Sequence, residues 1–193
     1  MFLFFPESGV TVLDVGCATG NLTIVLAKKF PNSTFIGQDY SGPAIDIANG
    51  NKAEDGLSNV TFVQGDGHDL PAEWTGHFDV VFVIDVLVNM ANPAKALEQM
   101  YKVIKDDGCL CLVEYGFHSE PRENVGDMFA AMFYTASVFF SLISTLKDNP
   151  QGGYGLMWGK DKIEAVLLSS KFKIAGKEIV RTMGTRGLFY CTK

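Results

Sequence analysis

The feature that most constrains the fold is the segment 12–21, where an apolar run passes into a turn of small residues. Residues 22–30 follow with the composition of a helix, which Pro31 ends. A strand that enters a helix through a glycine turn presents backbone N–H groups beyond the edge of its sheet. We therefore expect this segment to be a ligand cradle near the start of an α/β fold.

Strands and helices alternate along the first two thirds of the chain. Apolar and β-branched runs predict strands at 10–15, 34–38, 60–64, 78–84 and 109–114. Helices are predicted at 22–30, 43–54 and 93–104, and residues 105–108 (Lys-Asp-Asp-Gly) predict a turn before the last of these strands. This alternation favours a parallel, doubly wound sheet with right-handed crossovers.

The alternation breaks after residue 114. An apolar helix at 128–146 and a glycine-rich loop at 151–155 come first, and then a helix at 161–169 and closing strands at 173–180 and 187–192. Inserts at the carboxyl edge of such a sheet overhang the ligand crevice. We expect one domain over residues 1–193, with residues 116–159 forming a substrate lid.

The stretch 128–146 is uncharged and, at about 19 residues, is near the length of a membrane span. It contains several Ser and Thr residues and lies between elements of one predicted sheet. A span there would place parts of that sheet on opposite sides of a bilayer. We interpret the stretch as a buried or lid helix and expect no membrane span.

Charge and cysteine content exclude several classes of partner. The 193 residues include 16 Lys and Arg and 22 Asp and Glu, for a formal charge of −6, with no basic run. A nucleic acid partner is not expected, because phosphate neutralisation needs clustered cations. The four cysteines show no metal-binding spacing, so we expect no metal, free thiols and a cytoplasmic location. Residues 1–5 are apolar but lack a basic region, which argues against a signal peptide.

The spacing of the glycine turn distinguishes between cofactors. A dinucleotide fingerprint needs glycine at its first, third and sixth positions, where this chain has Gly16, Ala18 and Asn21. Asp14, Gly16, Ala18 and Gly20 instead form the pattern acid-x-Gly-x-small-x-Gly. This pattern resembles motif I of the class I S-adenosylmethionine-dependent methyltransferases. We expect Ala18 to adopt ordinary backbone angles.

Two further acids follow strands at the expected intervals. Asp39 comes 23 residues after Gly16, where a carboxylate can accept hydrogen bonds from a ribose diol. Asp66 lies in the Gly-Asp-Gly-His segment that follows the strand at 60–64. In the family that the motif resembles, an acid at this place accepts from the adenine amino group. Each acid could also be an ordinary turn residue.

The resemblance covers residues 10–115 and implies a Rossmann-like, doubly wound, seven-stranded sheet, mostly parallel with one antiparallel strand near the C-terminus. It also implies S-adenosylmethionine as cofactor and S-adenosylhomocysteine as product. The cofactor-binding candidates are Asp14, Gly16, Cys17, Ala18, Gly20, Asn21, Asp39, Tyr40, Asp66, Gly67, His68, Asp85 and Val86.

The later segment resembles one subgroup of these enzymes, through Glu123-Asn124, Tyr134 and residues 155–159. Members of this subgroup usually carry a winged-helix-like N-terminal domain, which we expect this chain to lack. In this family, elements before the first strand often mediate dimerisation. Since this chain is expected to lack them, a homodimer and a monomer both stay open.

The acceptor chemistry has several open alternatives. The family often has a His after the fourth strand, where this chain has Val88, so the candidates for a general base are Glu114, His118 and Tyr134. Each has a plainer alternative: Glu114 could cap a backbone group, His118 could be solvated and Tyr134 could pack. Trp158 could shape an apolar pocket or belong to the core.

We expect methyl transfer to a small, partly apolar molecule. The alternative is a non-catalytic S-adenosylmethionine-binding module or partner subunit. A nicotinamide-dependent oxidoreductase is a weaker hypothesis, because the glycine spacing is wrong for it.

Overall fold

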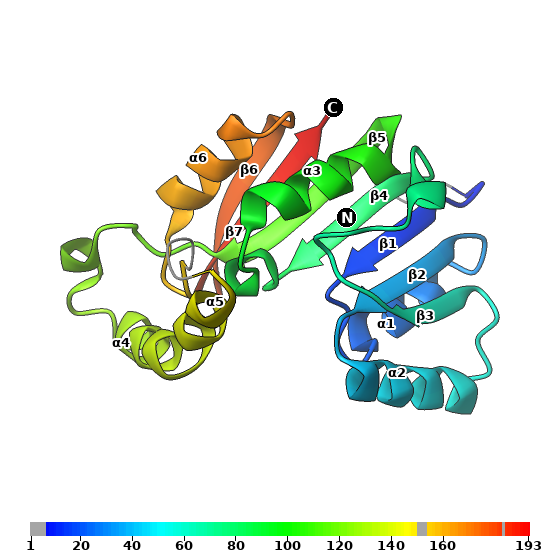
Figure 1. Cartoon of the computed structure of the whole chain (residues 1–193), viewed down its shortest axis with the longest axis horizontal. Coiled ribbons are helices and arrows are strands. Elements are labelled where there is room, and N and C mark those ends of the chain that lie inside the picture. The colour runs from blue at the N-terminus through cyan, green and yellow to red at the C-terminus, as the bar shows by residue number, and fades with distance from the viewer. Residues whose placement is uncertain (1–6, 150–153, 183) are drawn as a thin grey trace. The chain divides into compact units, whose positions relative to one another are not determined.

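Strands and helices alternate in the computed structural model, which describes residues 7–149, 154–182 and 184–193. Seven strands form a sheet in the order β3-β2-β1-β4-β5-β7-β6 (Figure 1). Pairing is parallel between β1 and β2, β1 and β4, and β2 and β3, and antiparallel between β6 and β7. The predicted fold class is confirmed. The strands are β1 (Thr11–Val15), β2 (Thr34–Asp39), β3 (Val60–Gln64), β4 (Phe78–Ile84), β5 (Ile104–Tyr115), β6 (Lys173–Thr182) and β7 (Gly184–Thr192).

Helices α2 and α4 begin at side-chain caps. Ser41 Oγ accepts from Ala44 N at 3.4 Å at the start of α2, and the Asp127 carboxylate accepts from two backbone N–H groups at the start of α4. The α-helices are α1 (Asn21–Lys29), α2 (Gly42–Glu54), α3 (Pro93–Val103), α4 (Met128–Ala136), α5 (Leu142–Asp148) and α6 (Lys160–Ser169). A π-helical turn, η5 (Ser137–Ser141), joins α4 to α5, and short 3-10 helices are η2 (Ala72–Trp74), η3 (Leu87–Asn89) and η4 (Pro121–Asn124).

The predicted turn at 105–108 is wrong, because β5 already begins at Ile104. A side chain at Gly108 would lie 2.8 Å from Asp79 O, and Lys105 Nζ lies 2.7 Å from Asp79 Oδ1. This segment is therefore held against the start of β4, and strand pairing outweighs its turn propensity. Residues 151–153 of the predicted glycine-rich loop lie outside the described part of the chain.

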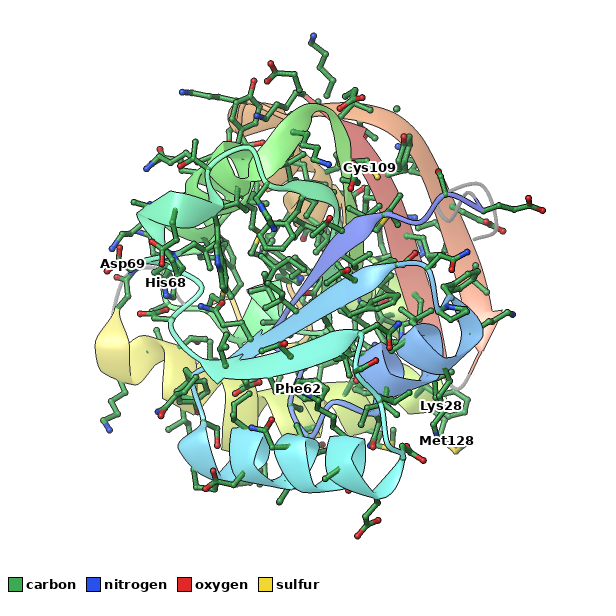
Figure 2. All side chains as sticks on the ribbon, turned by 90° about the vertical axis from the view of Figure 1, so that its right-hand side faces the viewer. Lys28, Phe62, His68, Asp69, Cys109 and Met128 are labelled. Carbon is green, nitrogen blue, oxygen red and sulfur yellow. The ribbon has the colours of Figure 1, made fainter. Side chains whose placement is uncertain are left out.

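The chain divides into two compact units. The first contains β1, β2, β3 and most of β4, and α1 and α2 pack against β2 and β3. Its buried side chains include Leu13, Phe35 and Val81. Phe62 points from β3 toward α2 (Figure 2), and its ring lies where side chains at Gly20 and Gly37 would be.

The second unit contains residues 84–98 and the described residues from Cys111 onward. Leu112, Trp158 and Ile163 are buried in it, and α6 packs against β6. A separate cluster joins Phe117, Ala130 and Met157 with partly buried Tyr115, Phe133 and Tyr134. The single domain over 1–193, with its lid, stays a prediction.

One described helix, Met128–Lys147, is long and apolar enough to span a membrane by length and composition. Its mean hydropathy is 1.6, and 22% of the most apolar window is buried. One helix of this kind is weak evidence for a span, since core helices of soluble proteins have the same composition.

Candidate functional site

The turn after β1 is attached to the end of β2. Gly16 N and Cys17 N both donate to Gln38 O, at 2.7 and 3.0 Å. Gly16 and Gly20 have φ angles of 76° and 77°, which glycine adopts without a Cβ penalty. Gly20 is the N-cap of α1, and no side chain caps this end of the helix. The turn therefore leaves the positive end of the α1 dipole without a side-chain partner.

Ala18 departs from the expected ordinary backbone angles. Its φ is 50°, in the left-handed region, and its N–H donates to Asp39 Oδ2 at 2.9 Å. The expectation is wrong because the turn needs this conformation to direct the Ala18 N–H toward β2. An L-residue is strained there.

Asp14 is buried on β1 with 6% exposure. Thr23 Oγ1 on α1 donates to its Oδ2 at 2.6 Å, which ties the strand to the helix behind the turn. Burial raises the pKa of Asp14 to about 6, against the opposing effect of the Thr23 hydrogen bond, and the charge of Asp39 raises it further. Asp14 is thus placed to brace the turn.

Asp39 is the last residue of β2 and uses both carboxylate oxygens. Oδ2 accepts from Ala18 N and Oδ1 accepts from Ser41 N, each at 2.9 Å. Since each carboxylate oxygen has more than one lone-pair site, Asp39 can still accept from a ligand.

Asp66 follows β3, and its Oδ1 accepts from His68 N at 2.9 Å and lies 2.8 Å from His68 Nδ1. The Asp66 side chain is 62% exposed, and the His68 side chain is 19% exposed. His68 and Asp69 lie in the loop that leaves β3 (Figure 2).

The three acids come from three adjacent parallel strands, so strand pairing brings them to one edge. Cys17 in the turn is buried, and burial raises the pKa of its thiol. Tyr40, after Asp39, is 80% exposed.

Within the second unit, Asp85 and Arg186 form an ion pair. Arg186 Nη1 donates to Asp85 Oδ1 at 2.7 Å, and the Arg186 guanidinium carbon lies 3.7 Å from the centre of the Tyr115 ring. Burial raises the pKa of Asp85, and the charge of Arg186 opposes this shift. Asp85 has a φ of 56°, and Val86 after it is the N-cap of η3.

Glu114 on β5 is fully buried. Its Oε1 accepts from Val88 N at 3.1 Å, which is the plainer backbone-capping role considered for this residue. Among the described residues, none forms a hydrogen bond with its Oε2. Burial raises the pKa of Glu114 to about 8, and the charge of Asp85 raises it further. Glu114 is therefore largely protonated at neutral pH, and its role as a base stays a prediction.

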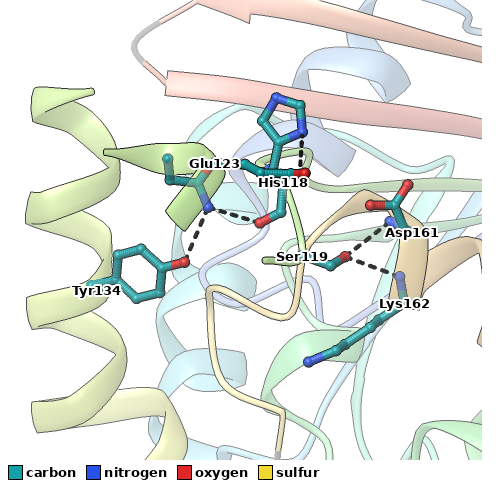
Figure 3. Close-up of polar contacts among 7 residues, drawn as sticks. His118, Ser119, Glu123, Tyr134, Asp161 and Lys162 are labelled. Carbon is teal, nitrogen blue, oxygen red and sulfur yellow. Dashed lines mark hydrogen bonds and ion pairs between the residues drawn. The ribbon is translucent and has the colours of Figure 1, made fainter. Parts of the chain in front are cut away.

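His118 and Tyr134 hold the segment after β5 to α4 (Figure 3). Asn124 Oδ1 accepts from His118 N at 3.1 Å, and Asn124 Nδ2 donates to His118 O at 2.8 Å and to the Tyr134 hydroxyl at 3.0 Å. His118 Nδ1 lies 3.3 Å from Glu123 Oε2, and its side chain is 48% exposed. We call these contacts of Asn124 with His118 and Tyr134 the Asn124 bracket. Next to His118, Ser119 Oγ accepts from Asp161 N and Lys162 N at the start of α6.

One residue of these contacts, Arg186, was not identified from the sequence. Arg186 lies 101 residues from Asp85, so no local pattern relates them. Asn124 was singled out only as part of a resemblance, and its bracket needs the folded positions of His118 and Tyr134. Trp158 is 1% exposed, which confirms its alternative as a core residue.

The described residues contain no group of three or more His, Cys, Asp or Glu side chains that could hold a metal ion.

Comparison with known proteins relates this chain to methyltransferases. A methyltransferase domain family matches residues 6–167. The demethylmenaquinone methyltransferase of Staphylococcus aureus strain JH9 is 30% identical over 179 residues, covering 92% of this chain and 66% of the relative. That of Lactococcus lactis strain IL1403 is 32% identical over 108 residues, covering 55% of this chain and 42% of the relative. The chain thus spans less than two thirds of the length of these curated relatives.

A solved structure supports the same fold. An S-adenosylmethionine-dependent methyltransferase from Methanosarcina mazei superposes with a TM-score of 0.74 at 18% identity, covering 100% of this chain and 96% of that one. From the strand order, the domain match and the curated relatives together, the chain belongs to the class I S-adenosylmethionine-dependent methyltransferases.

Proposed function

We propose that this chain transfers the methyl group of S-adenosylmethionine to a small, partly apolar acceptor. One observation supports the proposal most strongly. Asp14, Asp39 and Asp66 come from β1, from β2 and from the loop after β3, at the same edge as the N-terminus of α1, which has no side-chain cap. A ligand with a ribose, an amino group and a carboxylate matches this set of donors and acceptors.

Each part of the cofactor has a matching group in the first unit. Asp39 accepts from the ribose hydroxyls, and Asp66 accepts from the adenine amino group. The N-terminus of α1 attracts the cofactor carboxylate, by about 0.3–1 kcal/mol. Asp14 orients the amino group or braces the turn through Thr23. Other groups of this unit proposed to line the cofactor are Cys17, Asn21, Tyr40, Gly67 and His68.

The second unit supplies the features proposed to receive the acceptor. Tyr115 and Phe133 lie with ring centres 4.3 Å apart, and Phe117 and Phe133 lie 5.7 Å apart. The Arg186 guanidinium lies over the Tyr115 ring, 3.7 Å from its centre, and pairs with Asp85. We propose that these aromatic rings suit an acceptor with an apolar ring. The curated relatives are named for demethylmenaquinone, which supports an acceptor that is a small molecule.

Catalysis needs little acid–base chemistry from this chain. The sulfonium of S-adenosylmethionine supplies an activated methyl group, so positioning of donor and acceptor can provide most of the rate. The Glu114 carboxyl is largely neutral at pH 7 and accepts from Val88 N, so we propose that it positions the backbone there. Of the other two base candidates, the Tyr134 hydroxyl accepts from Asn124 Nδ2, whereas His118 bonds Asn124 through its backbone and its Nδ1 lies 3.3 Å from Glu123 Oε2.

The first test is cofactor affinity by calorimetry. We expect wild-type protein to bind S-adenosylmethionine below millimolar concentrations and Gly16→Val to lose at least tenfold in affinity, because φ at this position is 76°. Gly50→Val on α2 is the matched control, since a side chain there meets nothing within 4 Å. Equal affinities for wild type and Gly16→Val would place the cofactor elsewhere.

The second test is turnover. Protein is incubated with methyl-labelled S-adenosylmethionine and the small-molecule fraction of a cell extract. One labelled metabolite supports methyl transfer. Cofactor binding with no labelled product favours the non-catalytic binding module, and folded protein that binds no cofactor near millimolar concentrations defeats both.

A further inference from the structure

The helix formed by α4, η5 and α5 carries three of its polar side chains inward. Ser137, Ser141 and Thr145 recur every four residues and are 5%, 5% and 1% exposed. Ser141 Oγ accepts from Leu156 N at 2.8 Å, and Thr145 Oγ1 donates within the helix to Ser141 O at 3.1 Å. The stripe of small residues is therefore the side that packs against the rest of the second unit.

The opposite side of this helix is apolar and exposed. A surface helix of a soluble monomer usually has the reverse arrangement, with its apolar side against the core. The exposed side chains, which we call the outer face, are Met128 (77%), Phe129 (37%), Met132 (53%), Val138 (54%), Phe139 (71%), Phe140 (79%) and Ile143 (59%).

The area of the outer face is large for a monomer. With roughly 150–200 Å² for each fully exposed large side chain, these fractions leave on the order of 800 Å² of apolar surface. The largest apolar patch of a typical monomer covers about 300–600 Å², whereas a standard interface buries about 800 Å² per partner. One copy of the outer face thus supplies the area that one side of a stable dimer needs.

Charge argues against a lipid surface as the occupant. Residues 128–146 contain no Lys or Arg, and the whole chain has a formal charge of −6. Helices that bind anionic lipid surfaces have basic residues along their polar side. Here that side is filled by buried serine and threonine.

The helix is also fastened at its ends and its middle. Asn124 Nδ2 bonds the Tyr134 hydroxyl, Leu156 N bonds Ser141 Oγ, and Asn149 Nδ2 donates to Ala91 O at 2.9 Å. A helix crossing a bilayer would have to give up these bonds. We therefore expect the occupant to bind the outer face while the helix stays in its observed position.

We propose that the outer face is the dimerisation surface of this chain and that its occupant is the outer face of a second copy. A twofold axis places the same patch on both sides, so an uncharged apolar patch is self-complementary. Thr135 Oγ1 and Ser144 Oγ, also on the exposed side, already donate to helix carbonyls at 3.0 and 2.9 Å. Their hydroxyl hydrogens therefore keep a partner when the face is covered.

The test is sedimentation velocity of the full chain over a dilution series from about 100 µM downward, a range around the affinity expected of a modest interface of this area. We expect a dimer at the high end that dissociates on dilution. Phe140→Glu should raise the dissociation constant at least tenfold, because a dimer of this variant would bury two unpaired carboxylates. Leu168→Glu on α6 is the matched control, since Leu168 is 65% exposed in the same unit but lies outside the outer face.

Three outcomes would overturn the proposal. The wild-type protein could be a monomer at every concentration, or Leu168→Glu could weaken the dimer as much as Phe140→Glu does. The third outcome is that wild-type protein sediments with phosphatidylglycerol vesicles and Phe140→Glu abolishes this binding. Circular dichroism tests whether each variant is folded. If a variant does not fold, the oxidation of Met128 and Met132 in wild-type protein is measured instead. Peroxide should oxidise them more slowly at dimer-forming concentrations than after dilution, and equal rates would contradict the dimer.

Discussion

Replacing Gly37 with alanine tests whether the ring of Phe62 supports the cofactor turn. Gly37 lies on β2, in register with Asp14 of β1 and Phe62 of β3. A Cβ at this position would lie 2.5 Å from Phe62 Cδ1, 2.6 Å from Phe62 Cε1 and 2.9 Å from Cys17 Sγ. All three distances are below normal contact, so the ring must move. No left-handed φ adds backbone strain at Gly37, and the cost is therefore steric.

The expected magnitude follows from the packing around the ring. Adding a methyl group to a packed core costs about 1–3 kcal/mol. For a chain of this length each kcal/mol lowers the melting temperature by about 2–4 °C, so Gly37→Ala should melt roughly 2–12 °C lower. Cofactor affinity should fall as well, because the same ring lies 2.5 Å from a Cβ placed at Gly20 in the turn.

A double-mutant cycle with Phe62→Leu isolates this contact. Leucine lacks the far edge of the ring, so Gly37→Ala should cost less in that background, with a coupling of about 0.5–3 kcal/mol. Urea denaturation of the four proteins measures the cycle, and Gly50→Ala on α2, with open space around it, is the control. If Gly37→Ala costs the same with Phe62 as with leucine, the ring does not restrain the turn and the reasoning fails.

The remaining predictions concern the turn, the ribose site and the buried acid. Ala18→Gly should stabilise the protein by about 1 kcal/mol, since an L-residue at a φ of 50° is strained, and a loss of stability in urea would contradict this. Asp39→Ala should weaken S-adenosylmethionine binding by about 1.5–3 kcal/mol in calorimetry, and an unchanged affinity would refute the ribose assignment. Glu114 has a folded-state pKa of about 8 against an ordinary 4.5, so its stabilising effect is complete below pH 4.5 and is lost as pH rises through 8. Between those values unfolding releases the Glu114 proton, so each pH unit lowers the free energy of unfolding by up to about 1.4 kcal/mol. Glu114→Gln should therefore reduce the slope of the free energy of unfolding against pH. An unchanged slope would show that Glu114 is ionised when folded.

Much of the fold could be predicted from the sequence because its signals are local. The strands at 60–64 and 78–84 coincide with β3 and β4, since both are apolar runs between turn residues. The glycine turn and the acids after the first three strands also follow from short-range spacing. Adjacent parallel strands then bring those acids to one edge.

Tertiary structure decided the features that depend on distant residues. Pairing with β4 extended β5 back to Ile104, and the hydrogen bond from Ala18 N to Asp39 forced a left-handed alanine into the turn. Arg186 meets Asp85 across 101 residues, a relation that no periodicity encodes. In the helix from Met128 to Lys147, composition indicates an apolar segment, but which side faces inward depends on its bonds to residues after it. In the folded chain Ser141 of the polar stripe accepts from Leu156 N, which comes 15 residues later, while Phe139 and Phe140 are exposed.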